Sequence, residues 1–198
     1  MIDRGYKTTA DAMWLAEAAR AACGGKKRLA VLDAGIGPGG VALSLLDDNP
    51  ALMVAGVDVS DQMLSAAWLN ALANNREIEL IQSDIAKWKT SRLFDVVVTN
   101  PPYLAGTARK DKAHHNADIY QWTRVCAKRL RARGMFYCIV APDVLDKVVA
   151  ALYDSNCGEI QLTPIETKKD SISRVIISAR AGVKTPAKIN KSILIRNA

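Results

Sequence analysis

A glycine-rich segment near the start of the chain constrains the fold most tightly. An apolar run at residues 29–32 is followed by Asp-Ala-Gly-Ile-Gly-Pro-Gly-Gly at residues 33–40, and a second apolar run occupies residues 41–46. This order predicts a strand, a glycine loop and a helix, in which the loop backbone approaches a nucleotide-like ligand closely. Glycine suits such a loop because a Cβ atom would fill the space that the ligand occupies.

The glycine loop fits two classes of cofactor. Gly35, Gly37 and Gly40 have the spacing of the dinucleotide-binding fingerprint. Asp33 also begins a second pattern, in which every other residue up to Gly39 is a glycine, and this pattern is typical of proteins that bind S-adenosylmethionine (SAM). The loop alone therefore leaves both classes open.

An acidic residue follows the second apolar run. Residues 52–57 are apolar and end at Asp58. A carboxylate at this distance from the glycine loop accepts hydrogen bonds from ribose hydroxyls in nucleotide-binding proteins. Asp58 therefore favours a cofactor that contains adenosine, without choosing between the two classes.

A second motif lies directly behind the apolar run at residues 94–99. Asn100-Pro101-Pro102-Tyr103 places an amide side chain, a rigid carbonyl and an aromatic ring at the end of a buried strand. Those groups suit the task of holding a planar NH2 group while its nitrogen is alkylated. The same tetrapeptide also fits an ordinary proline turn, so its weight depends on the glycine loop upstream.

Hydrophobic periodicity predicts alternating strands and helices along the chain. The expected strands are residues 29–34, 53–58, 78–82, 94–99, 135–140, 158–166 and 172–180, with 191–196 as an extra candidate. The expected helices are residues 8–23, 38–48, 61–74, 116–132 and 143–153, the first capped by Thr8 or Thr9. This pattern predicts an α/β fold: a doubly wound, Rossmann-like, seven-stranded and mostly parallel sheet with one antiparallel strand in an edge hairpin.

Composition bounds the class of protein. With 198 residues, 49% of them hydrophobic, and a mean hydropathy of +0.01, we expect one globular domain over residues 1–198. Within it, residues 1–28 are expected to carry a helix that covers the cofactor, and residues 104–117 to form a loop over the substrate. The absence of a long apolar run and of a signal-peptide core favours a cytoplasmic location.

The cysteines and histidines argue against a metal site or a disulfide framework. The four cysteines form no Cys-x-x-Cys pair, and the only two histidines, His114 and His115, are adjacent. We therefore expect reduced, mostly buried thiols and no bound metal. The two histidines fit a loop or a phosphate contact better than a catalytic role.

Basic residues are concentrated in the second half of the chain. Residues 1–100 hold 10 Lys and Arg against 12 Asp and Glu, whereas residues 101–198 hold 17 against 8. One basic cluster spans residues 109–133 and another spans 168–196. Two interpretations stay open: solvated faces of helices and strands, or a surface that binds phosphates beside the substrate.

Taken together, the motifs resemble those of class I SAM-dependent methyltransferases. The order is the Asp-x-Gly-x-Gly-x-Gly loop, Asp58, Ser83-Asp84 and then Asn-Pro-Pro-Tyr. More narrowly, the chain is similar to the bacterial family that N6-methylates an adenosine beside the anticodon of valine tRNA. The similarity includes the pattern Asp-x-x-x-Leu-Ala at residues 11–16 and the basic stretch 173–182, whereas Leu104 stands where that family commonly has an aromatic residue.

This resemblance implies a role for each motif. The catalytic group would be Asn100, Pro101, Pro102 and Tyr103. The residues expected to bind SAM are Lys7, Thr9, Asp11, Asp33, Gly35, Gly37, Gly39, Asp58, Val59, Asp84, Ile85 and Asn100. The residues expected to bind RNA are Arg109, Lys110, Lys112, His114, Lys168, Lys169 and Arg174.

Some of these residues also have structural interpretations. Asp84 could serve as a helix cap, and Asp11 as an ordinary solvated helix residue. Trp68, Trp88 and Trp122 are expected to fill core or half-buried positions rather than to stack on bases.

Several functions are consistent with the sequence. The favoured one is methylation of adenine N6 in RNA, with tRNA as the partner, because an anticodon loop presents unpaired bases. A protein glutamine-N5 methyltransferase is the first alternative, since an amide NH2 is also planar and conjugated, but few residues precede the first strand. Methylation of DNA or of a small-molecule amine is the second alternative, and a nicotinamide-dependent dehydrogenase or a binding module is the third.

Overall fold

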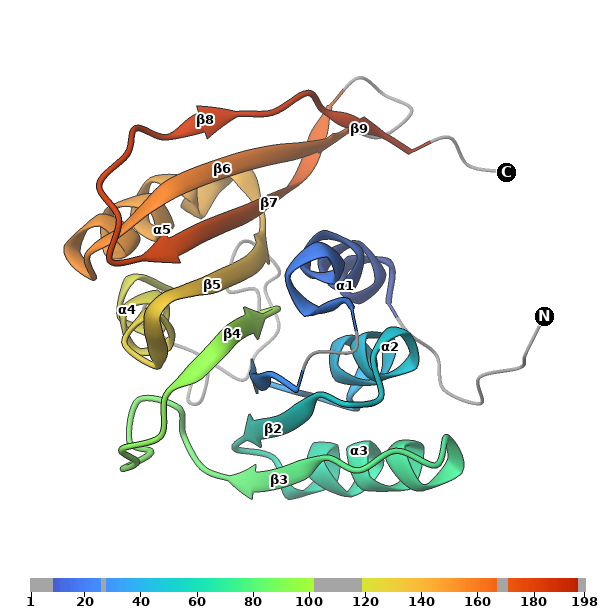
Figure 1. Cartoon of the computed structure of the whole chain (residues 1–198). Coiled ribbons are helices and arrows are strands. Elements are labelled where there is room, and N and C mark those ends of the chain that lie inside the picture. The colour runs from blue at the N-terminus through green and yellow to red at the C-terminus, as the bar shows by residue number, and fades with distance from the viewer. Residues whose placement is uncertain (1–8, 26–27, 102–118, 167–170, 196–198) are drawn as a thin grey trace, which may run out of the picture.

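One sheet with helices on both faces forms the body of the molecule (Figure 1). The computed structural model describes residues 9–25, 28–101, 119–166 and 171–195. The strands are β1 (Ala30–Ala34), β2 (Met53–Asp58), β3 (Glu79–Gln82), β4 (Phe94–Thr99), β5 (Leu130–Val140), β6 (Cys157–Glu166), β7 (Ile172–Ala181), β8 (Lys188–Ile189) and β9 (Ile193–Leu194). The helices are α1 (Ala10–Cys23), α2 (Gly40–Asp48), α3 (Asp61–Ala73), α4 (Ile119–Ala127) and α5 (Leu145–Asp154), with a 3-10 turn at Pro142–Val144.

The strand order is β3-β2-β1-β4-β5-β7-β6-β8, and β9 also pairs with β6. Strands β1 to β5 run parallel to one another, and β7 runs antiparallel to both β5 and β6. The predicted doubly wound α/β fold is therefore confirmed, including one antiparallel strand in a hairpin near the sheet edge. The predicted count of seven strands is too low, because the chain after β7 adds the two-residue strands β8 and β9.

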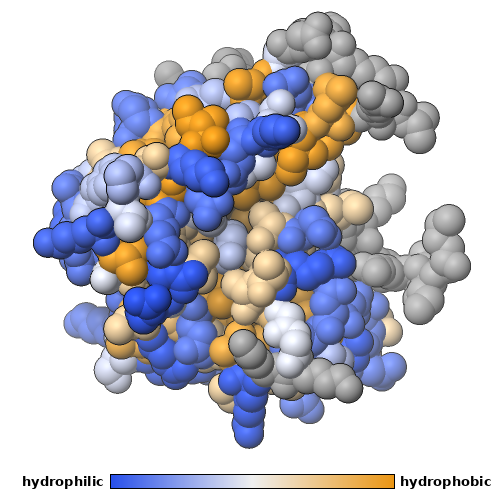
Figure 2. All heavy atoms as spheres, turned by 45° about the horizontal axis from the view of Figure 1, so that its top comes forward, coloured by the Kyte–Doolittle hydropathy of each residue, from blue (hydrophilic) through white to orange (hydrophobic). Residues whose placement is uncertain are grey.

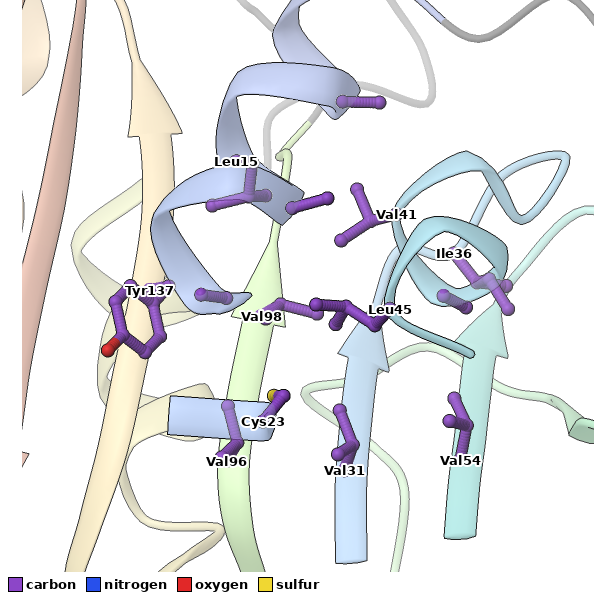
Figure 3. Packing of buried hydrophobic residues seen from close by; sticks show 14 of the residues in the cluster. Leu15, Cys23, Val31, Ile36, Val41, Leu45, Val54, Val96, Val98 and Tyr137 are labelled. Carbon is purple, nitrogen blue, oxygen red and sulfur yellow. The ribbon is translucent and has the colours of Figure 1, made fainter. Parts of the chain in front are cut away.

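Alternating side chains of the strands build a separate core on each face of the sheet. Val31 of β1 faces the cluster under α1, α2 and α3, whereas Leu32 faces the cluster under α4 and α5. All five residues of β1 are buried, as expected for a parallel strand covered by helices on both sides. The labelled core residues on the α1 side are Leu15, Cys23, Val31, Ile36, Val41, Leu45, Val54, Val96, Val98 and Tyr137 (Figure 3).

Helix α1 begins where the sequence predicts a cap. The Thr9 side chain accepts a hydrogen bond from the Ala12 N–H at 3.3 Å, which satisfies one of the unpaired donors of the first turn. Leu15, Ala16 and Ala19 are buried against the sheet and α2. Small alanines let this helix approach the sheet closely, and α1 lies beside β4 and β5 (Figure 1).

The helix predicted at 116–132 is shorter than expected within the described residues. Helix α4 ends at Ala127, and β5 already begins at Leu130, which pairs with Phe94 at the start of β4. Leu130 is buried as a strand residue, so its match to the helical period was misleading. Gly134 also lies inside β5, and Arg133 beside it adopts a φ of 63° where the register shifts.

The lateral edge of the sheet that β8 and β9 form exposes apolar side chains. Ile189 of β8 and both residues of β9, Ile193 and Leu194, are exposed. Figure 2 shows hydrophobic atoms as separate orange patches among hydrophilic ones on this side of the molecule. Within the described residues, which end at residue 195, the strand predicted at 191–196 is present only as β9.

All four cysteines are buried and unbridged, as the sequence predicts. Burial raises the pKa of Cys23 and of Cys126 to about 12, so both thiols stay protonated at neutral pH. Among the described residues, no cluster of His, Cys, Asp and Glu could hold a metal ion. None of the described helices combines the length and the apolarity needed to cross a lipid bilayer.

Candidate active site

The predicted cofactor and catalytic motifs meet at the carboxyl edge of the sheet. Parallel strands β3, β2, β1 and β4 are neighbours, so the segments that follow them leave the sheet at the same edge. Ala34 and Thr99 are register partners, which places Gly35 and Asn100 next to each other. The strand order also reverses between β1 and β4, and such switch points are where open α/β sheets bind ligands.

Strand β2 holds the glycine loop through backbone hydrogen bonds. The N–H groups of Gly35 and Ile36 both donate to the Val57 carbonyl oxygen, at 2.8 and 3.1 Å. Gly35 has a φ of 73°, which glycine adopts without strain. A Cβ built at Gly37 would meet no atom of the described residues within 4 Å, so the backbone there borders open space. The loop thus offers bare backbone to a ligand.

Asp58 ties the glycine loop to the turn after β2. Its Oδ2 accepts the Gly37 N–H at 2.9 Å, and its Oδ1 accepts the Ser60 N–H at 2.9 Å. Each carboxylate oxygen can accept a further bond, and Asp58 is only partly buried. Asp58 can therefore fix the loop and still accept bonds from hydroxyl groups of a ligand.

Asp33 caps helix α2 from within the sheet. Its Oδ2 accepts the Ala42 N–H at 3.2 Å, which supplies a partner for a donor in the first turn of α2. Asp33 is 1% exposed. Burial raises the pKa of Asp33 to about 7, the Ala42 hydrogen bond lowers it in part, and the charge of Asp58 raises it further. The sequence predicts that Asp33 holds cofactor groups, but its described contact is with the helix.

Asn100 carries a buried atom that is ready to accept a hydrogen bond. The residue is partly buried, yet its Oδ1 is fully buried and has no partner among the described residues. An unpaired buried acceptor costs about 1–3 kcal/mol, so it points to a ligand that supplies the donor. Pro101 is buried next to it, while Pro102 and Tyr103 lie outside the described residues.

Asp84 caps the turn that follows β3. Asp84 Oδ1 accepts the Ala86 N–H at 2.9 Å, and the Asp84 carbonyl accepts the N–H groups of Lys87 and Trp88. Asp84 thus acts as a cap of this turn, the structural alternative that the sequence left open. Ile85 is buried at 2% exposure, whereas Val59, after β2, is 65% exposed and accessible to a ligand.

Asp11 and Arg174 contact each other directly. The Arg174 Nε donates to the Asp11 Oδ2 at 2.9 Å, between α1 and β7. The sequence assigns Asp11 to the cofactor and Arg174 to RNA, and the described structure joins them in an ion pair. Thr9 serves as the cap of α1. The remaining predicted residues lie outside the described part of the chain: Lys7, Arg109, Lys110, Lys112, His114, Lys168 and Lys169.

Comparison with known proteins identifies the family. A family model described as the methyltransferase small domain matches residues 15–155, which is more than two thirds of the chain.

The chain belongs to this methyltransferase family.

Solved structures of other methyltransferases share the fold of this protein. A predicted O-methyltransferase from Agrobacterium tumefaciens superposes with a TM-score of 0.70 and 21% identity, over 93% of this chain and 86% of that one. The T. thermophilus 16S rRNA N2 G1207 methyltransferase, in complex with AdoMet and guanosine, superposes with a TM-score of 0.68 and 24% identity, over 88% of this chain and 44% of that one. The prediction of a class I SAM-dependent methyltransferase is confirmed, with SAM as the cofactor.

Curated relatives of this methyltransferase include proteins with two different functions. A release factor glutamine methyltransferase of Flavobacterium psychrophilum is 36% identical over 96 residues, which are 48% of this chain and 33% of the relative. A tRNA1(Val) (adenine(37)-N6)-methyltransferase of Glaesserella parasuis is 34% identical over 77 residues, which are 37% of this chain and 32% of the relative. The aligned part thus spans about a third of the curated relatives.

The basic residues between α4 and β5 lie away from the candidate active site of this methyltransferase. Arg131 stands at the amino end of β5, seven residues before Cys138, which pairs with Thr99. The register shifts between Leu130 and Met135, so Arg131 lies opposite Asp95, and the four residues from Asp95 to Thr99 span about 13 Å along β4. Arg131 also forms two 2.7 Å bonds with Asp95, and Arg129 donates to the carbonyls of Trp88 and Thr90. These contacts favour a structural role for Arg129 and Arg131 over the phosphate-binding interpretation.

Two residues at the candidate site, Trp122 and Gly56, were not predicted from the sequence to belong to it. Trp122 of α4 is half-buried, as the sequence predicts, but it also contacts Gly35 and Thr99. Gly56 of β2 leaves room for Ile36, because a Cβ there would lie 2.2 Å from the Ile36 Cδ1. Neither residue stands inside a motif, so only its neighbours in space reveal it.

Proposed function

We propose that this methyltransferase transfers a methyl group from SAM to a planar, conjugated amino nitrogen, and that this nitrogen is N6 of an adenosine in RNA. The observation that carries the proposal is the buried Oδ1 of Asn100, which lacks a partner among the described residues at the point where β4 leaves the sheet. It stands beside the glycine loop, so an amino group held there is close to the cofactor.

The residues of the carboxyl edge fit the cofactor. The open backbone at Gly37 suits the methionine end of SAM, and Asp58 has acceptor capacity left for the ribose hydroxyls. We propose that Ile85 and the cap residue Asp84, which follow β3 at the same edge, border the adenine ring. When bound, SAM supplies a methyl group that its sulfonium already makes electrophilic, so the protein needs to orient the acceptor rather than activate the donor.

Asn100 and Pro101 supply that orientation. The Asn100 Oδ1 and the Pro101 carbonyl oxygen can each accept one hydrogen of the NH2 group, which fixes the nitrogen and directs its lone pair away from the ring. Orientation of this kind lowers a barrier by roughly 7–11 kcal/mol. The sequence adds Pro102 to stiffen the turn and Tyr103 to stack on the base. Both oxygens are acceptors without strong basicity, so the proton leaves after methyl transfer.

Two observations support RNA as the acceptor. The second half of the chain has an excess of nine basic residues, which suits a phosphate backbone. A relative that matches 37% of this chain methylates adenine in tRNA1(Val). An adenosine of an anticodon loop in tRNA is the specific target that we propose, with Arg109, Lys110, Lys112, His114, Lys168 and Lys169 as phosphate contacts.

A release factor glutamine is the second candidate acceptor. Several curated relatives are release factor glutamine methyltransferases, at 34–40% identity over 40–48% of this chain. A glutamine NH2 is planar and conjugated like that of adenine, so Asn100 and Pro101 could hold it in the same way.

One labelling experiment separates the candidates. The protein is incubated with methyl-labelled SAM and either total tRNA or peptide-chain release factors, followed by mass spectrometry of nucleosides and of tryptic peptides. We expect N6-methyladenosine in tRNA and no label with Asn100→Ala. Label on a release factor glutamine alone would replace the RNA proposal by the second candidate, and label on neither would contradict both.

A further inference from the structure

Trp122 joins the cofactor motif to the catalytic motif. Its indole Nε1–H donates to the Thr99 Oγ1 at 3.0 Å, and the Thr99 hydroxyl donates to the Ala34 carbonyl oxygen at 2.7 Å. Ala34 is the residue before Gly35, and Thr99 is the residue before Asn100. The chain of hydrogen bonds thus links the last residues of β1 and β4.

The ring of Trp122 also packs on the glycine loop. A Cβ at Gly35 would lie 3.2 Å from the Cζ2 and 3.4 Å from the Cη2 of Trp122, so the ring edge occupies the space beside the Gly35 backbone. The loop is bounded on its other side by the Val57 carbonyl, which accepts two of its N–H groups. Gly35 is therefore clamped between β2 and an indole of α4.

The Thr99 hydroxyl at the centre of this chain of hydrogen bonds is buried and has little freedom to rotate. Thr99 is 1% exposed, and its hydroxyl donates its single proton to Ala34 and accepts the indole N–H with its oxygen. Removing the hydroxyl would leave the Ala34 carbonyl and the Trp122 N–H without these partners, which costs more than the bond itself is worth. The relay thus favours one relative position of the two strand ends.

We infer that Trp122, acting through Thr99, is a positioning residue that sets the spacing between the methyl donor and the amino group. The inference rests on the proposed function, since the glycine loop holds the donor and Asn100 the acceptor. The effect of Trp122 on the reacting atoms is indirect. It acts on Gly35 by packing and on Asn100 through the backbone of Thr99.

A matched pair at Thr99 tests the relay. Thr99→Val keeps the shape and removes the hydroxyl, whereas Thr99→Ser keeps the hydroxyl. For Thr99→Val and for Trp122→Phe we expect kcat to fall about 10–100-fold, with KM for SAM changed less than about fivefold. Thr99→Ser should stay within about threefold of the wild type. Equal kcat for the valine and serine variants would overturn the inference.

Fluorescence supplies a readout that needs neither activity nor a methyl acceptor. The triple variant Trp14→Phe, Trp68→Phe, Trp88→Phe leaves Trp122 as the only tryptophan in the sequence. Because this indole packs on the cofactor loop, its emission should shift on titration with S-adenosylhomocysteine. Calorimetry on the same sample shows whether the ligand binds.

The outcomes separate the two proposals. Binding with a shifted emission supports the inference, and binding with unchanged emission overturns it while the proposed function stands. Failure of the wild-type protein to bind S-adenosylhomocysteine would contradict the proposed function itself. Trp68→Phe alone, at a 57% exposed position on α3, is the control that should change none of these readouts.

Discussion

Asp11 and Arg174 form an ion pair between the first helix and the seventh strand, 163 residues apart in the sequence. The Asp11 side chain is 18% exposed and that of Arg174 is 32% exposed, so solvent screens the pair only in part. Arg174 also donates from Nη1 to the Ser173 carbonyl at 2.7 Å. This ion pair fastens α1 to β7 at the carboxyl edge, where the candidate active site lies.

A double-mutant cycle should detect this pair. We expect Asp11→Asn and Arg174→Met to show a coupling of about 1 kcal/mol in the free energy of unfolding, measured with urea. The Arg92–Glu79 pair, with side chains 47% and 52% exposed, is the control and should couple by less than about 0.5 kcal/mol. A coupling near zero for Asp11 and Arg174 would show that their contact does not stabilise the fold.

Replacing Asn100 should separate catalysis from cofactor binding. Asn100→Ala removes the buried acceptor, and we expect kcat to fall at least about 100-fold, in the range seen when a positioned polar group is removed. Affinity for SAM, measured by calorimetry, should stay within about fivefold, since Gly37 and Asp58 are unchanged. Wild-type turnover by this variant would remove Asn100 from the mechanism.

Asp58 should affect both the cofactor and the loop that holds it. Asp58→Ala removes the acceptors of the Gly37 and Ser60 N–H groups, and we expect affinity for SAM to fall about 10–100-fold by calorimetry. Asp58→Asn keeps one acceptor oxygen and should lose less. Ser60→Ala, which removes only the side-chain cap of α3, should lower thermal stability without changing affinity. Unchanged affinity in Asp58→Ala would exclude this residue from the site.

The buried carboxyl of Asp33 predicts a pH dependence of stability. Its pKa is about 7 in the folded protein and close to 3.8 in the unfolded chain. Between these values the folded state holds a proton that the unfolded chain has released. The stability that Asp33 contributes is therefore fully present below about pH 4 and is lost as the pH rises to about 7.

Asp33→Asn should remove this pH-dependent contribution to the free energy of unfolding. We expect the free energy of unfolding of the variant to vary less with pH than that of the wild type between about pH 4 and 7, in a series of urea titrations. Asp61→Asn, at an exposed position in the first turn of α3, is the control and should keep the wild-type pH profile over this range. Parallel profiles for wild type and Asp33→Asn would show that Asp33 has an ordinary pKa.

Arg131 should respond differently to charge reversal than Lys168 and Lys169. Arg131→Glu breaks two bonds to Asp95 on the far edge of the sheet, and we expect lower thermal stability with an unchanged salt dependence of tRNA binding. Reversal of Lys168 and Lys169, which the sequence assigns to RNA, should reduce the slope of log affinity against log salt by about 1 for each phosphate that is no longer neutralised. The reverse pattern would move the RNA surface to the amino edge of the sheet.

Local patterns predicted most of the fold. Strands β2 and β4 begin and end where the sequence indicates, because each is an apolar run bounded by polar residues or turns. The end of α4 was missed because Leu130 continues the helical period and yet pairs with Phe94, and that choice depends on a strand far away in the sequence. Pairing across the sheet overrides a local period in such cases.

The candidate site was predictable in its motifs and not in its connections. Asp58 and Asn100 stand out because each follows an apolar run at a recognisable place. The pairing of Asp11 with Arg174 and the packing of Trp122 on Gly35 join residues that share no motif. Periodicity and spacing carry no information on such pairs, which arise only when the sheet brings the elements together.

The position of β7 between β5 and β6 has a consequence for synthesis of the chain. Strand β5 ends at Val140, but its neighbour β7 ends only at Ala181. Strand β6 is synthesised before β7, although β7 is the strand that connects β6 to the rest of the sheet. At 5–20 residues per second, the ribosome takes about 2–8 s to make the residues in between. During that interval β5 is an open edge, and α1 lacks the arginine that fastens it. Until β7 has left the ribosome, the nascent chain therefore lacks the contact that holds α1 to the sheet at its carboxyl edge.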